Sequence, residues 1–439
     1  MDFLKEVEDY KEFLTVDELN KEIFKICDKK EVTILGKSDG GADILCVKLG
    51  NGKENALIYG FPHPNEPIGS LTCLTLIKLI KKHKEFAQSF TWHIISCADP
   101  DGAKLNEGWF KGDFTVKKYV YNFYRTQPKK QTDWSFPIKY KAYSFDKPPK
   151  NTEVLAKLIR ELKPSLVYPL HNAGFSGAYF YVTKDLGKGY YDKTIKLCKD
   201  LKIPLDLGEP ESPFMKTVKK PVYTHYGLRE IYDHFKKNGQ DPLKELDHGT
   251  NGIDYAKTYN KNVFGLIGEV SYIYDSKIED NNLSKESRED ILRIQYNEYS
   301  DIMSSVDEVL NLPDINKRSI FYELLNEVIK LERSLVRAAI EDLKDKSYKR
   351  KATNSEKFSS EVISKFYAAL ILGECRRLLL DSRKTKGIED AIGKVERKIN
   401  LLIEYIDKNS NYNLFPIKTL VQLQIGCLIL SLKSLEERK

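Results

Sequence analysis

The chain has 439 residues, a formal net charge of +7, and a composition that is 41% hydrophobic and 31% charged. This length exceeds what one hydrophobic core usually holds, so we expect two domains, and the composition is typical of a globular protein. The charge is modest for this size and its lysine runs are typical of solvated faces, so we expect no nucleic-acid partner. No apolar run approaches the length of a membrane span, so we expect no membrane partner.

The first six residues lack the basic segment followed by an apolar segment that marks a secretory signal peptide. The seven cysteines are scattered and none falls in a CxxC pair. This pattern favours buried free thiols in a reducing compartment over disulfides or zinc ligands. We therefore expect a cytoplasmic protein.

Apolar runs of strand length begin near residue 31. Residues 31–36 and 43–49 are joined by Ser38-Asp39-Gly40-Gly41, which predicts a hairpin. Strands, turns and helices then alternate to about residue 275. This alternation is typical of an α/β domain with a mixed central sheet that is flanked by helices on both faces.

The most informative stretch covers residues 60–69, GFPHPNEPIG. It follows an apolar run at 56–59 that predicts a buried strand, and it precedes a run at 71–80 with the spacing of a core-facing helix. Such a turn stands at the carboxyl edge of a sheet, where open α/β folds place their sites. It carries His63 and Glu66, an imidazole and a carboxylate that both suit Zn²⁺.

Two later apolar runs also end in chemically useful side chains. Residues 165–170 are followed by His171, which supplies the third protein ligand of a catalytic zinc site and leaves the fourth position for water. Residues 263–268 end at Glu269, a single carboxylate suited to act as a general base. We therefore expect the two turn residues and His171 to bind one Zn²⁺ ion per chain, with Glu269 beside it.

The order of these residues resembles that of the M14 zinc carboxypeptidase family. The family has an HxxE pair after a strand, as at His63 and Glu66, then a later histidine, as at His171, and then a strand-terminal glutamate, as at Glu269. Three further segments resemble its landmarks. Asp99-Pro100-Asp101-Gly102 is similar to its NPDG turn, Thr152-Glu153 to the SE segment before the third ligand, and residues 249–255 to the G-S-x-D-W stretch before the catalytic glutamate. The resemblance covers roughly residues 30–280 and implies a zinc carboxypeptidase-like fold.

The resemblance also implies roles for single residues. Asp133 stands where the family has D-x-N-R and would orient the first zinc histidine, His63; an ordinary loop aspartate is the alternative. Arg125 resembles the arginine that polarises the scissile carbonyl and stabilises the oxyanion, with a surface ion pair as the alternative. Asn172 would bind the substrate backbone. The segment that resembles the specificity pocket contributes Thr250, Ile253, Asp254 and Tyr255, although a buried structural role is equally open for Asp254.

The sequence departs from the family at one functional position. Ser135 and Phe136 stand where the family has Asn and Arg, and that arginine clamps the terminal carboxylate of the substrate through a bidentate pair. Recognition of a free C-terminus is therefore an open question. His225 and His248 lack ligand spacing to a strand-terminal carboxylate, so we expect no second metal.

After about residue 281 glycine nearly vanishes and apolar residues recur with helical periodicity. This predicts an all-helical C-terminal domain over residues 282–439, after a catalytic domain over residues 1–281. The resemblance does not extend over the helical domain. Its role is open between a bundle packed on the catalytic domain, a module for homo-oligomer formation and a platform for a partner. Helices are expected near 284–310, 315–346, 356–384, 388–408 and 416–437.

These observations predict a zinc-dependent hydrolase that cleaves a peptide or amide bond of a peptide or peptide-like substrate. The mechanism would be carboxypeptidase-like, with a metal-activated water and Glu269 as general base. One alternative is a deacylase or amidohydrolase that acts on a modified peptide or an N-acyl amino acid. The other is a non-catalytic zinc-binding scaffold, against which Glu269 argues, because a scaffold has no use for a base beside zinc.

Overall fold

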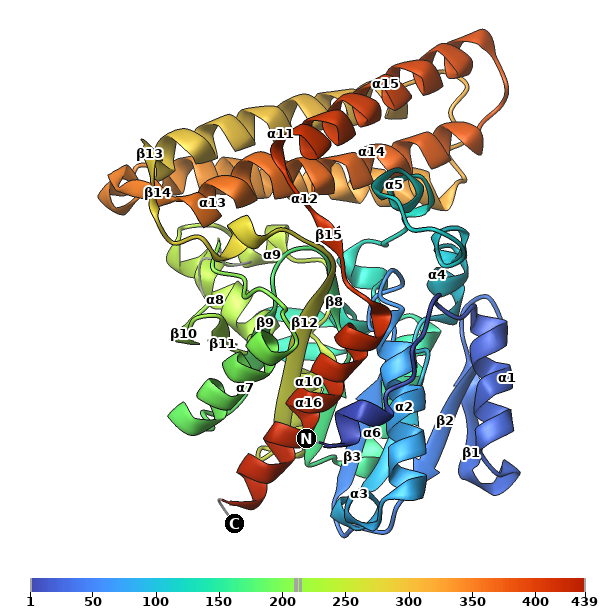
Figure 1. Cartoon of the computed structure of the whole chain (residues 1–439). Coiled ribbons are helices and arrows are strands. Elements are labelled where there is room, and N and C mark those ends of the chain that lie inside the picture. The colour runs from blue at the N-terminus through green and yellow to red at the C-terminus, as the bar shows by residue number, and fades with distance from the viewer. Residues whose placement is uncertain (1, 209–211, 213–214, 438–439) are drawn as a thin grey trace.

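A computed structural model describes residues 2–208, 212 and 215–437 of the chain (Figure 1). A mixed sheet with helices on both of its faces fills the lower part of the view, and a bundle of long helices lies across one end of it. The predicted fold, an α/β domain with a mixed central sheet and a helical C-terminal region, is confirmed.

The main sheet has eleven strands, and its path runs β1–β2–β4–β3–β7–β12–β9–β11–β10, with β8 and β15 also paired to β12. The predicted hairpin is confirmed, because β1 and β2 pair antiparallel. A separate small sheet contains β5 (Ile138–Tyr140) and β6 (Tyr143–Phe145). The main-sheet strands are β1 (Val32–Lys37), β2 (Asp43–Leu49), β3 (Asn55–Tyr59), β4 (Thr91–Ile95), β7 (Leu166–Pro169), β8 (Asn172–Phe175), β9 (Tyr179–Val182), β10 (Thr217–Lys219), β11 (Val222–Thr224), β12 (Phe264–Tyr274) and β15 (Asn413–Leu414).

The centre of this sheet determines where the site forms. β3 runs parallel to β7, with Tyr59 opposite Pro169, and β7 runs parallel to β12. Parallel strands end at the same edge of a sheet, so the turn after β3 and the residue after β7 come together there. β12 is longer than its neighbours and carries Glu269 past that edge, where it lies opposite Tyr179 of β9.

Helices cover both faces of the sheet. α2 packs in the larger core together with α7 and α16, while α6 and α10 pack in the core of the opposite face. Residues 68–77 of α2 are all buried, as expected of a helix that is apolar on every side. The helices before residue 281 are α1 (Val16–Ile26), α2 (Ile68–Lys82), α3 (Lys84–Ser89), α4 (Pro100–Lys104), α5 (Val116–Asn122), α6 (Lys150–Leu162), α7 (Lys188–Asp200), α8 (Leu228–Lys237), α9 (Pro242–Glu245) and α10 (Gly252–Tyr259).

The C-terminal region forms long helices close to the predicted ranges. They are α11 (Arg288–Leu310), α12 (Ile320–Asp342), α14 (Ser364–Leu380) and α15 (Lys386–Asn409). The helix expected near 356–384 is interrupted, because α13 (Asn354–Phe358) continues through a π-helical segment over 359–363 into α14. A short two-stranded sheet of β13 (Leu283–Ser287) and β14 (Lys351–Thr353) was not expected in an all-helical region.

The last helix, α16 (Ile417–Glu436), leaves the bundle and packs on the main sheet between α2 and α7. Contrary to expectation, it is long and apolar enough to cross a membrane by length and composition alone, with a mean hydropathy of 1.2. However, 72% of that window is buried inside the protein, which accounts for its apolar composition as a core helix. The domain boundary at 281/282 stays a prediction, and side chains from both sides of it share one core.

Candidate metal centre and active site

The turn between β3 and α2 carries His63 and Glu66. A Cβ atom added to Gly69, the second residue of α2, would lie 2.7 Å from the Cβ of Leu170. Because only glycine allows so close an approach, the start of α2 packs directly against the end of β7. The local sequence therefore brings Glu66 beside His171, the residue that follows Leu170.

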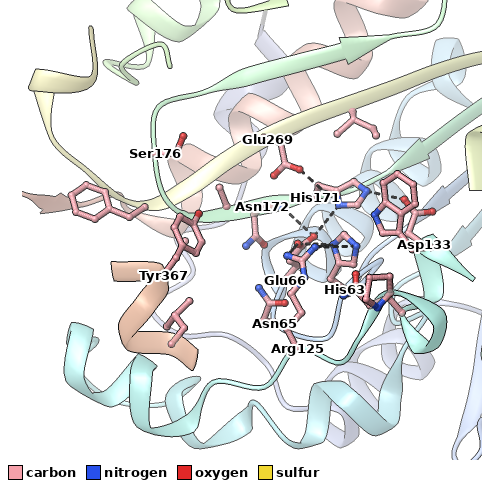
Figure 2. Close-up of a pocket in the computed structure, with 18 of the residues that line it drawn as sticks. His63, Asn65, Glu66, Arg125, Asp133, His171, Asn172, Ser176, Glu269 and Tyr367 are labelled. Atoms are coloured by element: carbon pink, nitrogen blue, oxygen red, sulfur yellow. Dashed lines mark hydrogen bonds and ion pairs between the residues drawn. The ribbon is translucent and has the colours of Figure 1, made fainter. Parts of the chain in front are cut away.

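His63, Glu66 and His171 converge at this point (Figure 2). Glu66 Oε1 lies 2.8 Å from His63 Nδ1, and Glu66 Oε2 lies 3.1 Å from His171 Nδ1. One potential ligand atom from each side chain lies within 4.8 Å of the others, and all three residues are buried. Two imidazoles and one carboxylate are a zinc-binding set that leaves a position open. The three predicted ligands are thus brought together, and their chemistry fits that ion.

The charges at this cluster depend strongly on one another. Burial and then the Arg125 guanidinium lower the pKa of His63 to about 4. Burial opposes ionisation of Glu66, yet the imidazoles of His63 and His171 outweigh it and hold the Glu66 pKa below its ordinary value. Burial likewise opposes protonation of His171, but the nearby carboxylates of Glu66 and Asp133 raise the His171 pKa well above its ordinary value. Protonation is therefore favoured at His171 and disfavoured at His63, and both imidazoles lie beside an ionised Glu66.

Asp133 orients a different histidine from the one expected. Its Oδ2 lies 3.1 Å from His171 Nε2, whereas the resemblance implied a contact with His63. Its Oδ1 accepts hydrogen bonds from the Tyr59 hydroxyl at 2.6 Å and from the Gly252 amide at 3.0 Å. A carboxylate held on both oxygens fixes the ring of His171, so that Nδ1 faces Glu66.

Glu269 and Arg125 stand on either side of the cluster (Figure 2). Glu269 Oε1 is 3.9 Å from His171 Nδ1. Arg125 Nη1 lies 3.4 Å from Glu66 Oε1 and its Nη2 lies 3.1 Å from His63 Nδ1. The side chain of Arg125 is 36% exposed, which leaves it room to turn into the cavity. A carboxylate and a guanidinium thus flank the position where a metal would bind.

These side chains line one cavity of about 680 Å³. Asn172 also lines it: its amide donates to Glu66 Oε2 at 3.2 Å, and its side-chain amide donates to the Tyr272 hydroxyl at 2.7 Å. Of residues 249–255, which form the predicted specificity segment, Asn251 lines the cavity and the four predicted substrate-binding residues do not. Those four, which make contacts inside the domain, are Thr250, Ile253, Asp254 and Tyr255.

Helices of the C-terminal region form one wall of the cavity through α11, α12 and α14. Glu374 and Arg377 of α14 hold the segment that carries Arg125, and Gln424 of α16 donates to the backbone oxygen of His171 at 2.8 Å. Sequence reasoning missed these residues, because a charged or amide side chain on an amphipathic helix has no pattern that marks it. His225, set aside as a second metal ligand, lines the cavity as well.

Comparison with known proteins bears on the identity of this site. Residues 17–193 match the family model Peptidase_M14, zinc carboxypeptidase. No relative is found among curated protein sequences. One similar solved structure is a protein of Shewanella amazonensis assigned as a metallopeptidase, with 12% identity, a TM-score of 0.41, and coverage of 58% of this chain and 84% of that one. Another is carboxypeptidase A of Helicoverpa armigera, with 12% identity, a TM-score of 0.36, and coverage of 59% of this chain and 65% of that one. A third is murein-tripeptide amidase MpaA of Escherichia coli O157, with 12% identity, a TM-score of 0.29, and coverage of 60% of this chain and 89% of that one. The resemblance of this chain to the M14 zinc carboxypeptidases, read first from its motifs, is confirmed by the family match over residues 17–193.

Proposed function

We propose that this protein is a zinc-dependent hydrolase of a peptide or amide bond. The observation that carries the proposal is the convergence of His63, Glu66 and His171 in a cavity that Glu269 and Arg125 also line. The family match supports a zinc-dependent peptide hydrolase in general terms. The metal-binding scaffold is disfavoured, because a base and a guanidinium donor beside the ligands serve catalysis rather than binding.

The roles follow from the chemistry of each side chain. Zinc, when bound to the three ligands, supplies Lewis-acid chemistry and lowers the pKa of a water. Glu269 accepts a proton from the attacking water and passes it to the leaving amine. Arg125 donates hydrogen bonds to the carbonyl oxygen as negative charge develops on it. Asp133 keeps the His171 ring oriented throughout.

The second candidate function is hydrolysis of a modified peptide, which two observations favour. An N-acyl amino acid, the other substrate of that alternative, carries a free carboxylate and gains no support from them. Phe136, which replaces the carboxylate-clamping arginine, is 0% exposed and its backbone pairs with Thr250. Among the described residues that line the cavity, Arg125 is the only Lys or Arg. A substrate without a free C-terminal carboxylate therefore suits the cavity better than one that has it.

Metal content tests the proposal first. Elemental analysis of the purified protein should find about one zinc per chain, as a three-ligand catalytic site holds. His171→Ala should lose it, while His83→Ala, at the C-terminal end of α2, should keep it. Absence of zinc in the wild type, and no uptake on addition, would exclude the hydrolase.

Hydrolysis of peptides with free and with amidated C-termini then separates the two candidate functions. Glu269→Gln should retain zinc and lose roughly 10²- to 10⁴-fold in kcat, as expected for a lost general base.

We also propose a reducing cytoplasm as the location, which is supported by seven buried cysteines with free thiols. Homo-oligomer formation through the helical region stays a prediction.

A further inference from the structure

One histidine of the cavity wall has a buried ring that lacks a hydrogen bond. His225 directly follows β11, is 9% exposed and lines the cavity that holds the metal-binding cluster. Neither of its ring nitrogens makes a hydrogen bond of standard geometry to a described residue, and the Asn251 side chain is the polar group that interacts with the ring. Burial lowers the pKa of His225 to about 3, so the ring is neutral and offers one donor and one acceptor. Buried polar groups are rarely left unsatisfied, which suggests that a ligand meets this ring.

Aromatic side chains line the same cavity as this histidine, and the ring centroid of Tyr226 lies 6.5 Å from that of His225. The ring centroids of Trp134 and Tyr226 are 5.8 Å apart. The ring centroid of Tyr181 lies 6.1 Å from that of Tyr226 and 6.1 Å from that of Tyr223. All four rings line the cavity. Such a wall offers a large apolar contact area around one neutral hydrogen-bonding group.

This wall adjoins Asp133, since Trp134 is the next residue in the chain. Figure 2 shows Asp133 and Tyr367 of α14 on opposite sides of the metal-binding residues, and both line the cavity. The arginine expected on the Asp133 side is replaced by the buried Phe136.

The charge of the cavity argues against a carboxylate on this side. The described lining contains one guanidinium, that of Arg125, which lies against His63 and Glu66. It contains six carboxyl groups, those of Glu66, Asp133, Asp206, Glu269, Glu332 and Glu374. A further carboxylate brought beside Trp134 would lose its water and meet no Lys or Arg other than Arg125 among the described lining residues, which is unfavourable. The ammonium of Lys257 lies outside the lining, although it acts on His225 and, after burial, lowers the pKa of that ring further.

We propose that His225, with Trp134, Tyr181, Tyr223 and Tyr226, forms a subsite for the leaving part of the substrate. The group it takes is aromatic or apolar and ends in an uncharged amide, to which the His225 ring hydrogen-bonds. This inference rests on the proposed function, and it replaces recognition of a free C-terminus by recognition of a blocked one. The side chain of Asn251, held by Asp254 and Tyr226, backs the subsite.

Binding to the Glu269→Gln protein tests the subsite without turnover. The probes are the acetylated tripeptides Ala-Ala-Phe and Ala-Ala-Gly, each made with a free and with an amidated C-terminus, and titration calorimetry measures their affinity. The amidated phenylalanine peptide should bind at least about tenfold tighter than its free acid, a difference of about 1.4 kcal/mol. The glycine pair should bind more weakly in both forms.

His225→Phe keeps an aromatic ring at this position and removes both ring nitrogens. In the Glu269→Gln background it should lower the preference for the amide by about five- to tenfold, the range expected for one lost hydrogen bond to a neutral group. His234→Phe on α8 is the control and should leave the preference unchanged, and zinc content reports on folding in each variant.

The outcomes separate this inference from the proposed function. Free acids that bind as tightly as amides, or a preference that survives His225→Phe, would overturn the subsite. Wild type that binds the amides but hydrolyses none of the peptides would leave the subsite standing and remove the hydrolase.

Discussion

The backbone amide of Arg125 donates a hydrogen bond to Glu374 of α14, at 3.0 Å from N to Oε1. One turn further along the helix, Arg377 donates to the backbone oxygens of Leu105, Asn122 and Phe123 at 2.9 to 3.0 Å. The helical region thus holds the segment that aims Arg125 at the cavity. This gives residues beyond 281 a direct part in the site, rather than a merely peripheral one.

Replacement of Arg377 by Gln should lower kcat by about 10- to 100-fold, since a small misplacement of a group at the reacting centre has effects of this size. Zinc content and KM should stay close to those of the wild type. The neighbouring Arg376 pairs with Glu396 of α15, so Arg376→Gln is the matched control and should keep full activity.

A double-mutant cycle shows whether Arg377 acts through Arg125. In an Arg125→Ala background, the further change Arg377→Gln should cost little more activity, because the group that it positions is already gone. Fully additive losses in the cycle would mean that Arg377 acts by another route.

The pH dependence of stability should report on Glu374. Burial raises the Glu374 pKa to about 8 from an ordinary value of 4.5. A raised folded-state pKa means that the native state holds the proton more tightly. This contribution to stability is therefore complete below about pH 4.5 and is lost as the pH rises through about 8. The loss at high pH is on the order of a few kcal/mol.

Glu374→Gln keeps an oxygen that accepts from Arg125 but does not titrate. The variant should therefore show a flatter decline of unfolding free energy between about pH 5 and pH 9 than the wild type, as measured by urea denaturation. Burial also raises the pKa of Glu332 and that of Asp99 to about 7. These two groups lower the unfolding free energy of both proteins alike as the pH rises, so their effect cancels when the two proteins are compared. Glu341, an exposed residue near the end of α12, supplies the control, and Glu341→Gln should leave the slope as it is. A Glu374→Gln protein with the wild-type slope would contradict the assignment.

Asp133→Asn should weaken zinc binding by about 10- to 100-fold, as is typical when the partner that orients a metal-binding histidine is altered. The reason is that Oδ2 of Asp133 fixes His171 while Oδ1 is held by Tyr59 and Gly252. Competition with a fluorescent chelator measures the affinity. Asp101→Asn, which disturbs contacts with Ser38 and Gly40 instead, should bind zinc like the wild type.

Much of the site was predictable because it depends on where strands end. Apolar runs that finish at Tyr59 and Leu170 predict two strands with the candidate ligands at their carboxyl ends. In the structure these strands, β3 and β7, run parallel, which brings the residues that follow them to one edge. The partner of Asp133 was not predictable, because loop geometry decides which histidine it meets. Arg377 and Glu374 were missed for a related reason: periodicity predicts that α14 exists and is amphipathic, but not which turn of it docks against residues 105–125.

Gly69→Ala should disturb both folding and metal binding. The added Cβ would lie 2.7 Å from both the Cβ and the backbone oxygen of Leu170, so the start of α2 must move away from the end of β7. We expect a loss of about 1–3 kcal/mol in the free energy of unfolding, typical of overpacking in a core. Zinc affinity should fall as well, because Glu66 moves with α2 and His171 with β7.

Gly393→Ala in α15 is the matched control for this change. A Cβ there would meet only the end of the Arg397 side chain, at 3.5 Å. Without a clash, alanine in a helix interior should stabilise the protein by about 0.5–1 kcal/mol. Urea denaturation should therefore show a lower free energy of unfolding for Gly69→Ala and a higher one for Gly393→Ala. Zinc titration should show a weaker affinity for Gly69→Ala alone. If Gly69→Ala proved as stable and as zinc-bound as Gly393→Ala, close packing of α2 on β7 would not be what sets the distance between Glu66 and His171.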